Sequence, residues 1–336
     1  MLLATNSLSL RPNARLSACL TAMFFLLLNI SPVLAQVPAE GDLQRRPRVG
    51  LALGGGGMRG AAHVGVLKVL ERESIPIDCI AGTSMGAVVG GLYSAGVSVE
   101  ELEHKFSDGS LMKAFMTVPI SVRVAASPLF FFGRMVGAKP FDGMYRGGIF
   151  REYLLHSLPK SSEPNIEKLR IPFSAVALNL VDGKAYSLTK GNLGVALQAS
   201  SAVPMLRRPV PIDDKLFVDG GVVANLPVKQ ARELGADVVI AVDVDETFDP
   251  MPPDSFRRMG SVAHRVLTLH LTKVDEEQLA DANVLIHPSV NGISLVSTKT
   301  KDAKAAISAG ERAAEAVVPL IKKLIESRDL TVHNQE

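Results

Sequence analysis

Cysteine is scarce in this chain, since only Cys19 and Cys79 occur among its 336 residues. The first 35 residues have the features of a removable segment, and without them Cys79 is the one cysteine left. One cysteine cannot form an intramolecular disulfide, so the fold does not rest on a disulfide framework. The chain also lacks internal repeats and low-complexity tracts. With 47% hydrophobic residues it can bury a sizeable core, so we expect a globular protein.

Acidic residues are absent from residues 1–35, which hold two arginines, an apolar run over 16–30 and small residues before Ala35. This order is typical of a secretory signal peptide that is cleaved after Ala35. An uncleaved membrane anchor is the alternative, but spanning a bilayer takes roughly 20 apolar residues, more than this run provides. We therefore expect export, to the periplasm or to the outside of a bacterial cell.

Neither sign of charge predominates. The chain has 36 Lys and Arg against 34 Asp and Glu, and loss of the two arginines in residues 1–35 leaves 34 of each. A neutral protein is a poor partner for nucleic acid, so we expect no nucleic-acid partner. No cluster of metal-ligating residues stands out along the sequence, and we expect neither a metal nor a cofactor.

Strand-length and helix-length patterns alternate from residue 48 onward, after a polar, proline-containing stretch at 36–47 that we interpret as a linker. The apolar runs at 49–53 and 77–81 are each followed by a glycine-containing turn and a helical pattern. Residues 236–244 form a nearly all-apolar run of the kind found in strands buried on both faces. The pattern predicts an α/β fold, with a mainly parallel sheet and helices on both sides.

The pentapeptide GTSMG at 82–86 lies between the second predicted strand and its helix. Glycines two residues on either side of Ser84 leave room for a tight strand-to-helix turn that exposes a nucleophilic hydroxyl. A simpler interpretation is a loop in which Ser84 only caps the helix.

A second glycine-rich turn, GGGGMRG at 54–60, also follows a strand and precedes a helix. Gly55, Gly57 and Gly60 fit the spacing of a dinucleotide-binding loop, but that fold needs an acidic residue about 20 positions downstream, where this chain has GTSMG instead. No lysine followed by Ser or Thr closes the loop, which argues against a P-loop. Because the loop fully fits neither nucleotide-binding motif and GTSMG follows it, the sequence favours an oxyanion hole built from loop amides.

A serine nucleophile needs a base, and the histidines are poorly placed to provide one. His63 lies in an apolar helical stretch that indicates a packed structural role, and the other histidines belong to no motif. His287 is the best placed for a triad, because the histidine comes last in hydrolases of that kind. The other candidate base is Asp219, in Asp219-Gly220-Gly221, although Asp-Gly is by itself a turn signal.

Three segments, GGGGMRGAAHVGVL, GTSMG and VDGGVVANLP, occur in this order and together resemble the patatin-like phospholipases and acyl hydrolases, over about residues 48–244. The resemblance implies a three-layer α/β/α sandwich and a Ser84–Asp219 dyad that works without histidine. It also implies an oxyanion hole from Gly55, Gly56 and Gly57. The implied activity is hydrolysis of ester bonds in phospholipids or lysophospholipids, with release of fatty acid and no metal or cofactor.

On this basis we expect a patatin-like catalytic domain at 48–250 and a C-terminal extension at 251–336 that packs on the same domain. Residues 111–141 form an insert with four basic residues, no acidic ones and five of the 13 phenylalanines. Such an insert suits contact with an anionic lipid surface, or else it covers the core as a cap.

Two other functions stay open from the sequence. One is a non-catalytic lipid- or phosphate-binding protein, in which the glycine loop only cradles an anion. The other is an esterase or thioesterase that acts on other acyl substrates. Arg59, near the start of the helix after the glycine loop, is a candidate substrate-binding residue for either a hydrolase or a binding protein.

Overall fold

The computed structural model describes residues 46–117, 143, 145–247, 249–257 and 261–333. The predicted signal peptide at 1–35, most of the 36–47 linker and residues 118–141 of the predicted insert lie outside these ranges. Residues 46–336 belong to one structural unit, which therefore holds both the predicted catalytic domain and the predicted extension.

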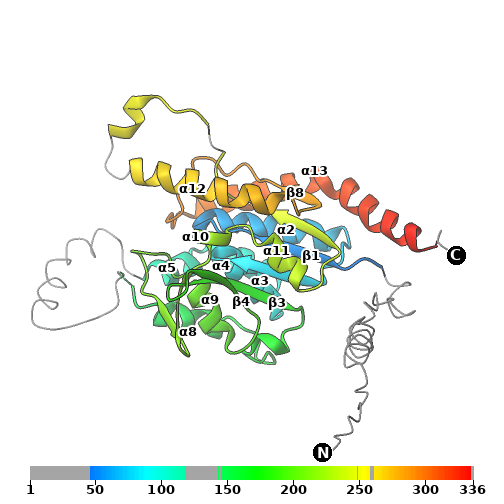
Figure 1. The fold of residues 1–336 in the computed structure, drawn as a ribbon, viewed down its shortest axis with the longest axis horizontal. Helices are drawn as coiled ribbons and strands as arrows, with labels where there is room; N and C mark the ends of the chain where they lie inside the picture. Colours follow the sequence, from blue (N-terminus) through cyan, green and yellow to red (C-terminus); the bar gives the residue numbers. More distant parts are fainter. Residues whose placement is uncertain (1–45, 118–142, 144, 248, 258–260, 334–336) are drawn as a thin grey trace, which may run out of the picture. The chain divides into compact units, whose positions relative to one another are not determined.

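A central sheet of eight strands organises the described residues (Figure 1). The strands β3, β2, β1, β7 and β8 run parallel, whereas β4 and β6 run antiparallel to β3, and β5 pairs with β6. The sheet is therefore mixed, with its parallel part in the middle and at one edge. The bounds of the strands are β1 Val49–Leu53, β2 Cys79–Thr83, β3 Phe173–Asn179, β4 Lys184–Leu188, β5 Val210–Ile212, β6 Lys215–Asp219, β7 Val238–Val242 and β8 Val284–Ile286.

Strand β3 has an unusual set of neighbours. Its pairing with β4 covers Ala175 to Asn179 and occupies one edge. The other edge is shared, because β2 pairs with the first half of β3, as far as Thr83 opposite Val176, and β6 pairs with the second half, from Asp219 opposite Ala177. Strands β2 and β6 thus meet end to end along one edge of β3.

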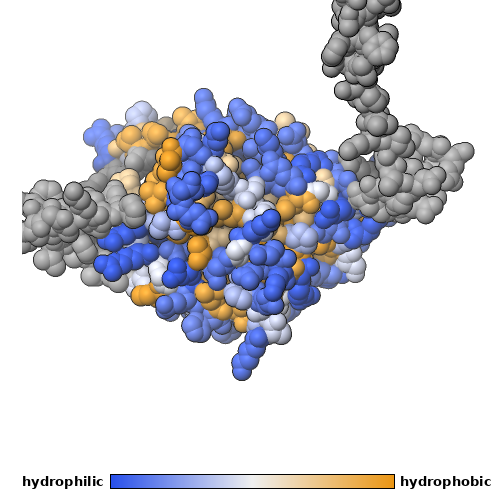
Figure 2. All heavy atoms as spheres, turned by 60° about the horizontal axis from the view of Figure 1, so that its bottom comes forward, coloured by the Kyte–Doolittle hydropathy of each residue, from blue (hydrophilic) through white to orange (hydrophobic). Residues whose placement is uncertain are grey.

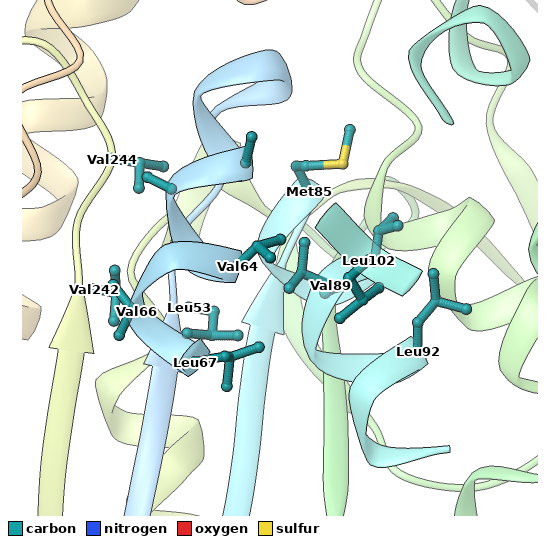
Figure 3. Packing of buried hydrophobic residues seen from close by; sticks show 14 of the residues in the cluster. Leu53, Val64, Val66, Leu67, Met85, Val89, Leu92, Leu102, Val242 and Val244 are labelled. Atoms are coloured by element: carbon teal, nitrogen blue, oxygen red, sulfur yellow. The ribbon is translucent and has the colours of Figure 1, made fainter. Parts of the chain in front are cut away.

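Helices cover both faces of the sheet, as expected for a three-layer α/β/α sandwich. Side chains of β1 alternate: Leu51 and Leu53 join the large core on one face and Ala52 joins a smaller core on the other. Figure 3 shows Val64 and Leu67 of α2 in the large core beside Leu53. The helices are α2 Ala61–Arg72, α3 Met85–Ser94, α4 Val99–Ser107, α5 Ser110–Met116, α8 Gly148–His156, α9 Leu193–Ser200, α10 Gly221–Ala224, α11 Val228–Glu233, α12 Ser261–Leu279 and α13 Thr300–His333, with 3-10 turns η2 Gly57–Gly60, η3 Ile166–Lys168 and η4 Pro253–Arg257.

The C-terminal helix α13 lies directly against α2. A Cβ placed on Gly65 would come 2.0 Å from the carbonyl oxygen of Ile307, and one on Gly310 would come 2.0 Å from that of Ala62. The two backbones approach this closely because both contact positions are glycines. Ile307 and Ile321 of α13 belong to the large core, so this helix is part of the folding unit.

The described part of the predicted insert is helix α5, and its apolar side chains are buried. Leu111, Met112, Phe115 and Met116 all belong to the large core. Residues 111–116 therefore contribute to the fold, while lipid contact by the remainder of 111–141 stays a prediction.

The exterior is mostly hydrophilic on the face shown in Figure 2, where apolar side chains are scattered among polar ones. Among the described residues, none of the helices combines the length and the apolar character needed to cross a bilayer.

Candidate active site

Ser84 stands at a sharp turn between β2 and α3, as GTSMG predicts. Its backbone has φ 54° and ψ −119°, a strained conformation for a residue with a side chain. The flanking glycines make the turn possible: a Cβ on Gly82 would come 2.5 Å from the Cα of Ala87, and one on Gly86 would come 2.2 Å from the carbonyl oxygen of Leu53. The Ser84 amide donates to the Ser200 hydroxyl at 3.0 Å, which holds the turn against α9.

Asp219 is the partner of the Ser84 side chain. The Ser84 hydroxyl donates to Asp219 Oδ2 at 2.6 Å, and the Gly221 amide donates to Asp219 Oδ1 at 2.8 Å. The sheet explains the contact, because Ser84 follows the last residue of β2 and Asp219 ends β6, where these two strands meet along β3. The register of β3 therefore places the two side chains together.

Burial sets the acidity of Asp219, whose side chain has almost no solvent contact. Loss of solvation raises the pKa of Asp219 from about 3.8 to about 6, against the opposing effect of the hydrogen bonds from Ser84 and Gly221. The carboxyl is thus a stronger base than an exposed aspartate and is still mostly ionised at neutral pH.

The glycine loop at 54–57 lies beside Ser84, and its amides differ in what they contact. Gly54 donates to Val242 O at 3.0 Å and Gly55 donates to Asn225 O at 3.3 Å. Gly56 and Gly57 have no hydrogen-bond partner for their amides within the described ranges. Of the three predicted oxyanion-hole residues, Gly56 and Gly57 therefore have amides available to a ligand, whereas the Gly55 amide is already engaged.

Ser84, Asp219 and the glycine loop line one cavity. Its remaining wall is largely apolar and comes from segments that are far apart in the sequence. An ester carbonyl beside Ser84 would thus be surrounded by groups suited to an acyl chain. The apolar residues of the wall are Phe115, Val203, Pro204, Leu206, Val222, Leu271, Leu295 and Val296.

The two histidines considered as bases have other partners. His63 is fully buried, as the sequence indicates, and a ring nitrogen bonds to Gly54 O at 2.8 Å. Burial lowers the pKa of His63 to about 4, so this ring is neutral. His287 bonds to Asp243 at 3.1 Å, which raises its pKa, and it does not line the cavity. Neither ring is hydrogen-bonded to Ser84, whose hydroxyl bonds to Asp219.

Arg59, the candidate substrate-binding residue, is committed to the fold. Its side chain is 4% exposed, forms an ion pair with Glu246 at 2.8 Å and donates to Ile293 O at 2.7 Å. These contacts join η2 to the segments after β7 and β8. We therefore assign Arg59 to the scaffold of the glycine loop and not to substrate binding.

Sequence reasoning missed a group of polar residues behind the glycine loop. Asn225 donates to Asp245 and to Asp275, both at 3.0 Å, and both carboxyls are buried. Oxygens of Asp243, Asp245 and Asp275 lie within 4.8 Å of one another, which is a donor set of the type that hard cations accept. Burial is the main cause that raises the pKa of Asp245 to about 8 and that of Asp275 to about 7. No local motif marks this group, because its members come from the segments that follow α10 and β7 and from the last turns of α12.

The chain is similar to several known proteins. Residues 51–232 match the family model described as patatin-like phospholipase. An uncharacterized NTE family protein of Mycobacterium tuberculosis is 35% identical over 215 residues, 62% of this chain and 53% of that protein. The lysophospholipase nte1 of Emericella nidulans is 33% identical over 245 residues, 69% of this chain and 15% of that protein.

This chain thus spans about half the length of the mycobacterial relative and much less of the fungal one. Among solved structures, that of VipD from Legionella pneumophila aligns with 84% of this chain and 67% of its own, at 14% identity and a TM-score of 0.45. The family match covers the end of β1, the glycine loop, the Ser84 turn and Asp219 within a single stretch. The chain belongs to the patatin-like phospholipase family.

Proposed function

We propose that this protein is a serine acyl hydrolase in which Ser84 is the nucleophile and Asp219 is its base. The observation that carries the proposal is the 2.6 Å hydrogen bond from the Ser84 hydroxyl to the buried Asp219 carboxylate, inside an apolar cavity that the glycine loop also lines. A protein that only binds anions needs neither the strained serine turn nor the aspartate. Membership of a phospholipase family supports the same class of reaction.

The chemistry proceeds in two steps. Asp219 takes the Ser84 proton as the oxygen attacks the acyl carbonyl, and the Gly56 and Gly57 amides receive the oxyanion. Collapse of this intermediate breaks the ester bond, and protonated Asp219 returns its proton to the departing alcohol. Water then attacks the acyl enzyme with Asp219 again as the base, which releases the fatty acid and regenerates Ser84.

As substrates we propose phospholipids or lysophospholipids. The cavity wall is apolar around the reacting serine, which suits an acyl chain, and the fungal relative carries the name lysophospholipase. Incubation of the protein with a mixed lipid extract, followed by identification of the released products, tests this choice. Release of fatty acid from non-lipid esters or thioesters alone would contradict it.

The nucleophile is tested separately from the substrate. A fluorophosphonate probe should label the wild-type protein at Ser84, and Ser84→Ala should abolish both labelling and ester hydrolysis. Ser187→Ala is a matched control, because Ser187 lies in β4 and its hydroxyl bonds to Glu233 away from the cavity. Labelling that persists in Ser84→Ala would place the nucleophile at another residue.

Export and membrane contact remain part of the proposal. Mass spectrometry of the exported protein should find Gln36 at the amino terminus if residues 1–35 are a cleaved signal peptide. Charge reversal at Arg123 and Arg134 should weaken binding to anionic vesicles without affecting hydrolysis of a soluble ester. An intact amino terminus would refute cleavage, and unchanged vesicle binding would refute a role for the insert.

A further inference from the structure

Asn225 lies between the glycine loop and the turn that carries Asp219, two parts of the proposed catalytic site. It directly follows α10, the short helix that begins two residues after Asp219. Its side chain is nearly completely buried, and the residue lines the same cavity as Ser84 and Asp219. The chain segment that carries the base therefore leads within a few residues to Asn225.

On one side, Asn225 contacts the glycine loop. Its carbonyl oxygen accepts the Gly55 amide at 3.3 Å. Its side-chain oxygen lies so near that a Cβ on Gly55 would come within 2.5 Å of it, and a Cβ on Gly221 would come within 3.1 Å. Asn225 therefore separates the glycine loop from the turn that carries Asp219, and it touches both.

On the other side, buried carboxyls hold Asn225 in place. The side-chain amide donates one hydrogen to Asp245 and one to Asp275, each at 3.0 Å, so both of its donor hydrogens are used. The next amide, that of Leu226, donates to Asp275 at 2.8 Å. These bonds tie Asn225 to the segment after β7 and to α12.

The serine turn is attached to the same segment. The hydroxyl of Thr83, the residue before the nucleophile, donates to the carbonyl oxygen of Ala224 at 2.8 Å. Residues 224–226 thus receive or make hydrogen bonds to the serine turn, the glycine loop, the segment after β7 and α12. They are a common support for the groups that the proposed reaction needs.

We propose that Asn225 is a positioning residue that fixes the glycine loop relative to Ser84 and Asp219. An oxyanion hole is effective only when its donors are already aimed at the developing charge, so the loop must be held before substrate arrives. The side chain of Asn225 supplies this restraint, because the two carboxyls fix its amide and its backbone carbonyl in turn holds Gly55. This inference rests on the proposed function and identifies the residue that pre-organises its oxyanion hole.

The restraint predicts a selective kinetic defect. In Asn225→Ala the carbonyl at 225 loses its side-chain anchor, and the Gly56 and Gly57 amides lose their alignment. We expect kcat on a soluble ester to fall about 10- to 100-fold, less than the 10²–10³-fold that removal of an oxyanion donor costs. KM should change by less than about 3-fold, because ground-state binding to the apolar wall is unaffected.

Asn283→Ala is the matched control. Asn283 also bridges separate segments, since its oxygen accepts from Val239 N at 2.8 Å and from Arg232 at 2.6 Å. These contacts lie near the start of β7, at the end of the sheet away from Ser84. This variant should lose thermal stability and keep kcat. If Asn225→Ala does not fold, Asn225→Ser keeps a small polar side chain but has a single donor hydrogen and cannot donate to both carboxyls, so it should show the same selective fall in kcat.

The outcomes separate the inference from the function on which it rests. A folded Asn225→Ala or Asn225→Ser protein with wild-type kcat would overturn the inference alone. A raised KM with unchanged kcat would also overturn it, because Asn225 would then be a substrate contact. If Asn283→Ala lost as much kcat as Asn225→Ala, the defect would result from general destabilisation and not from misalignment of the glycine loop. A folded wild type that neither hydrolyses esters nor reacts with the fluorophosphonate probe would refute the proposed function and the inference with it.

Discussion

At the residue scale, the raised pKa of Asp219 determines how the proposed activity responds to pH. Protonated Asp219 cannot accept the Ser84 proton, so kcat/KM should fall as the pH drops below about 6. Above that pH, kcat/KM should no longer change with pH. A profile measured on one soluble ester between pH 4 and 8 checks this, and an acid limb centred near pH 4 would show that burial does not tune the base.

Substitution of Asp219 should reduce activity strongly. Asp219→Asn keeps the shape of the side chain but cannot take a proton, and loss of a general base costs about 10²–10⁴-fold in rate. The same assay on His287→Ala and His63→Ala provides the comparison, because a triad would require one of these rings. A folded Asp219→Asn protein with near-normal kcat/KM would rule out the dyad.

The same aspartate should lower the stability of the fold at neutral pH. Its pKa is about 6 when folded and about 3.8 in the unfolded chain, so the folded state binds the proton more tightly. The free energy of unfolding therefore decreases as the pH rises from about 4 to about 6, by up to about 3 kcal/mol, and stays lower above pH 6.

Asp219→Asn removes this buried charge, so its melting temperature should exceed that of the wild type at pH 7–8. The difference should shrink as the pH approaches 4, where the wild-type carboxyl is also neutral. Thermal unfolding of both proteins across this range is the measurement. A less stable Asp219→Asn protein at pH 8 would mean that the hydrogen bonds to the carboxylate outweigh its desolvation.

The strand-to-helix turn alone indicates Ser84 as a nucleophile, whereas Asp219 is predicted as its partner only through the family resemblance, because the residues by themselves leave His287 open as the base. Asn225 and Asp275 were missed because they meet only in the folded chain, 50 residues apart in sequence. Arg59 was assigned to substrate because its position near a helix start suggests an anion site. Its partners, Glu246 and Ile293, are too distant in the sequence to be foreseen.

At the scale of elements, the contact between α2 and α13 depends on glycine. Gly65→Ala and Gly310→Ala would each drive a methyl group into the backbone of the other helix, so each should destabilise the fold by about 1–3 kcal/mol. Gly148→Ala in α8 is the matched control, because nothing lies within 4 Å of a Cβ at that position. Denaturant unfolding of the three variants checks this, and equal effects at 65 and 148 would contradict it.

Several elements follow from local chemistry alone. The Ser98 hydroxyl accepts the Glu101 amide at 3.2 Å, and this side-chain cap begins α4. The turn at Asp182-Gly183 joins β3 to β4, and Gly183 has the positive φ that such a turn requires. The end-to-end meeting of β2 and β6 could not be predicted, since no local pattern specifies which edge of β3 a distant strand will occupy.

At the scale of the whole molecule, the folding unit extends beyond the family match. The match ends at residue 232, yet β7 pairs along the whole of β1 and α13 contributes to the large core. A protein restricted to residues 46–233 exposes one edge of β1 and the apolar face of α2, so we expect it to be insoluble or unfolded. Circular dichroism and fluorophosphonate labelling, compared with residues 46–336, test this; a folded and reactive short form would contradict it.

The predicted α/β architecture, with a mainly parallel sheet between helical layers, is confirmed. Alternating strand and helix patterns suffice for this, because near-continuous apolar strands can be buried only between two layers. Of the antiparallel strands, β5 is the least visible in the sequence, since it is only three residues long and has Pro211 at its centre.

The shared edge of β3 also makes the proposed hydrolytic activity depend on completion of the fold. Ser84 and Asp219 are separated by 135 positions in the chain, and they meet only after two strands of opposite direction have aligned along the same seven-residue strand. A chain that is still being synthesised, or one that has paired these strands out of register, presents a lone serine and a distant carboxylate. On the proposed mechanism, the chain gains hydrolytic activity only when the fold is complete, so labelling of Ser84 by a fluorophosphonate probe can be used to follow its folding.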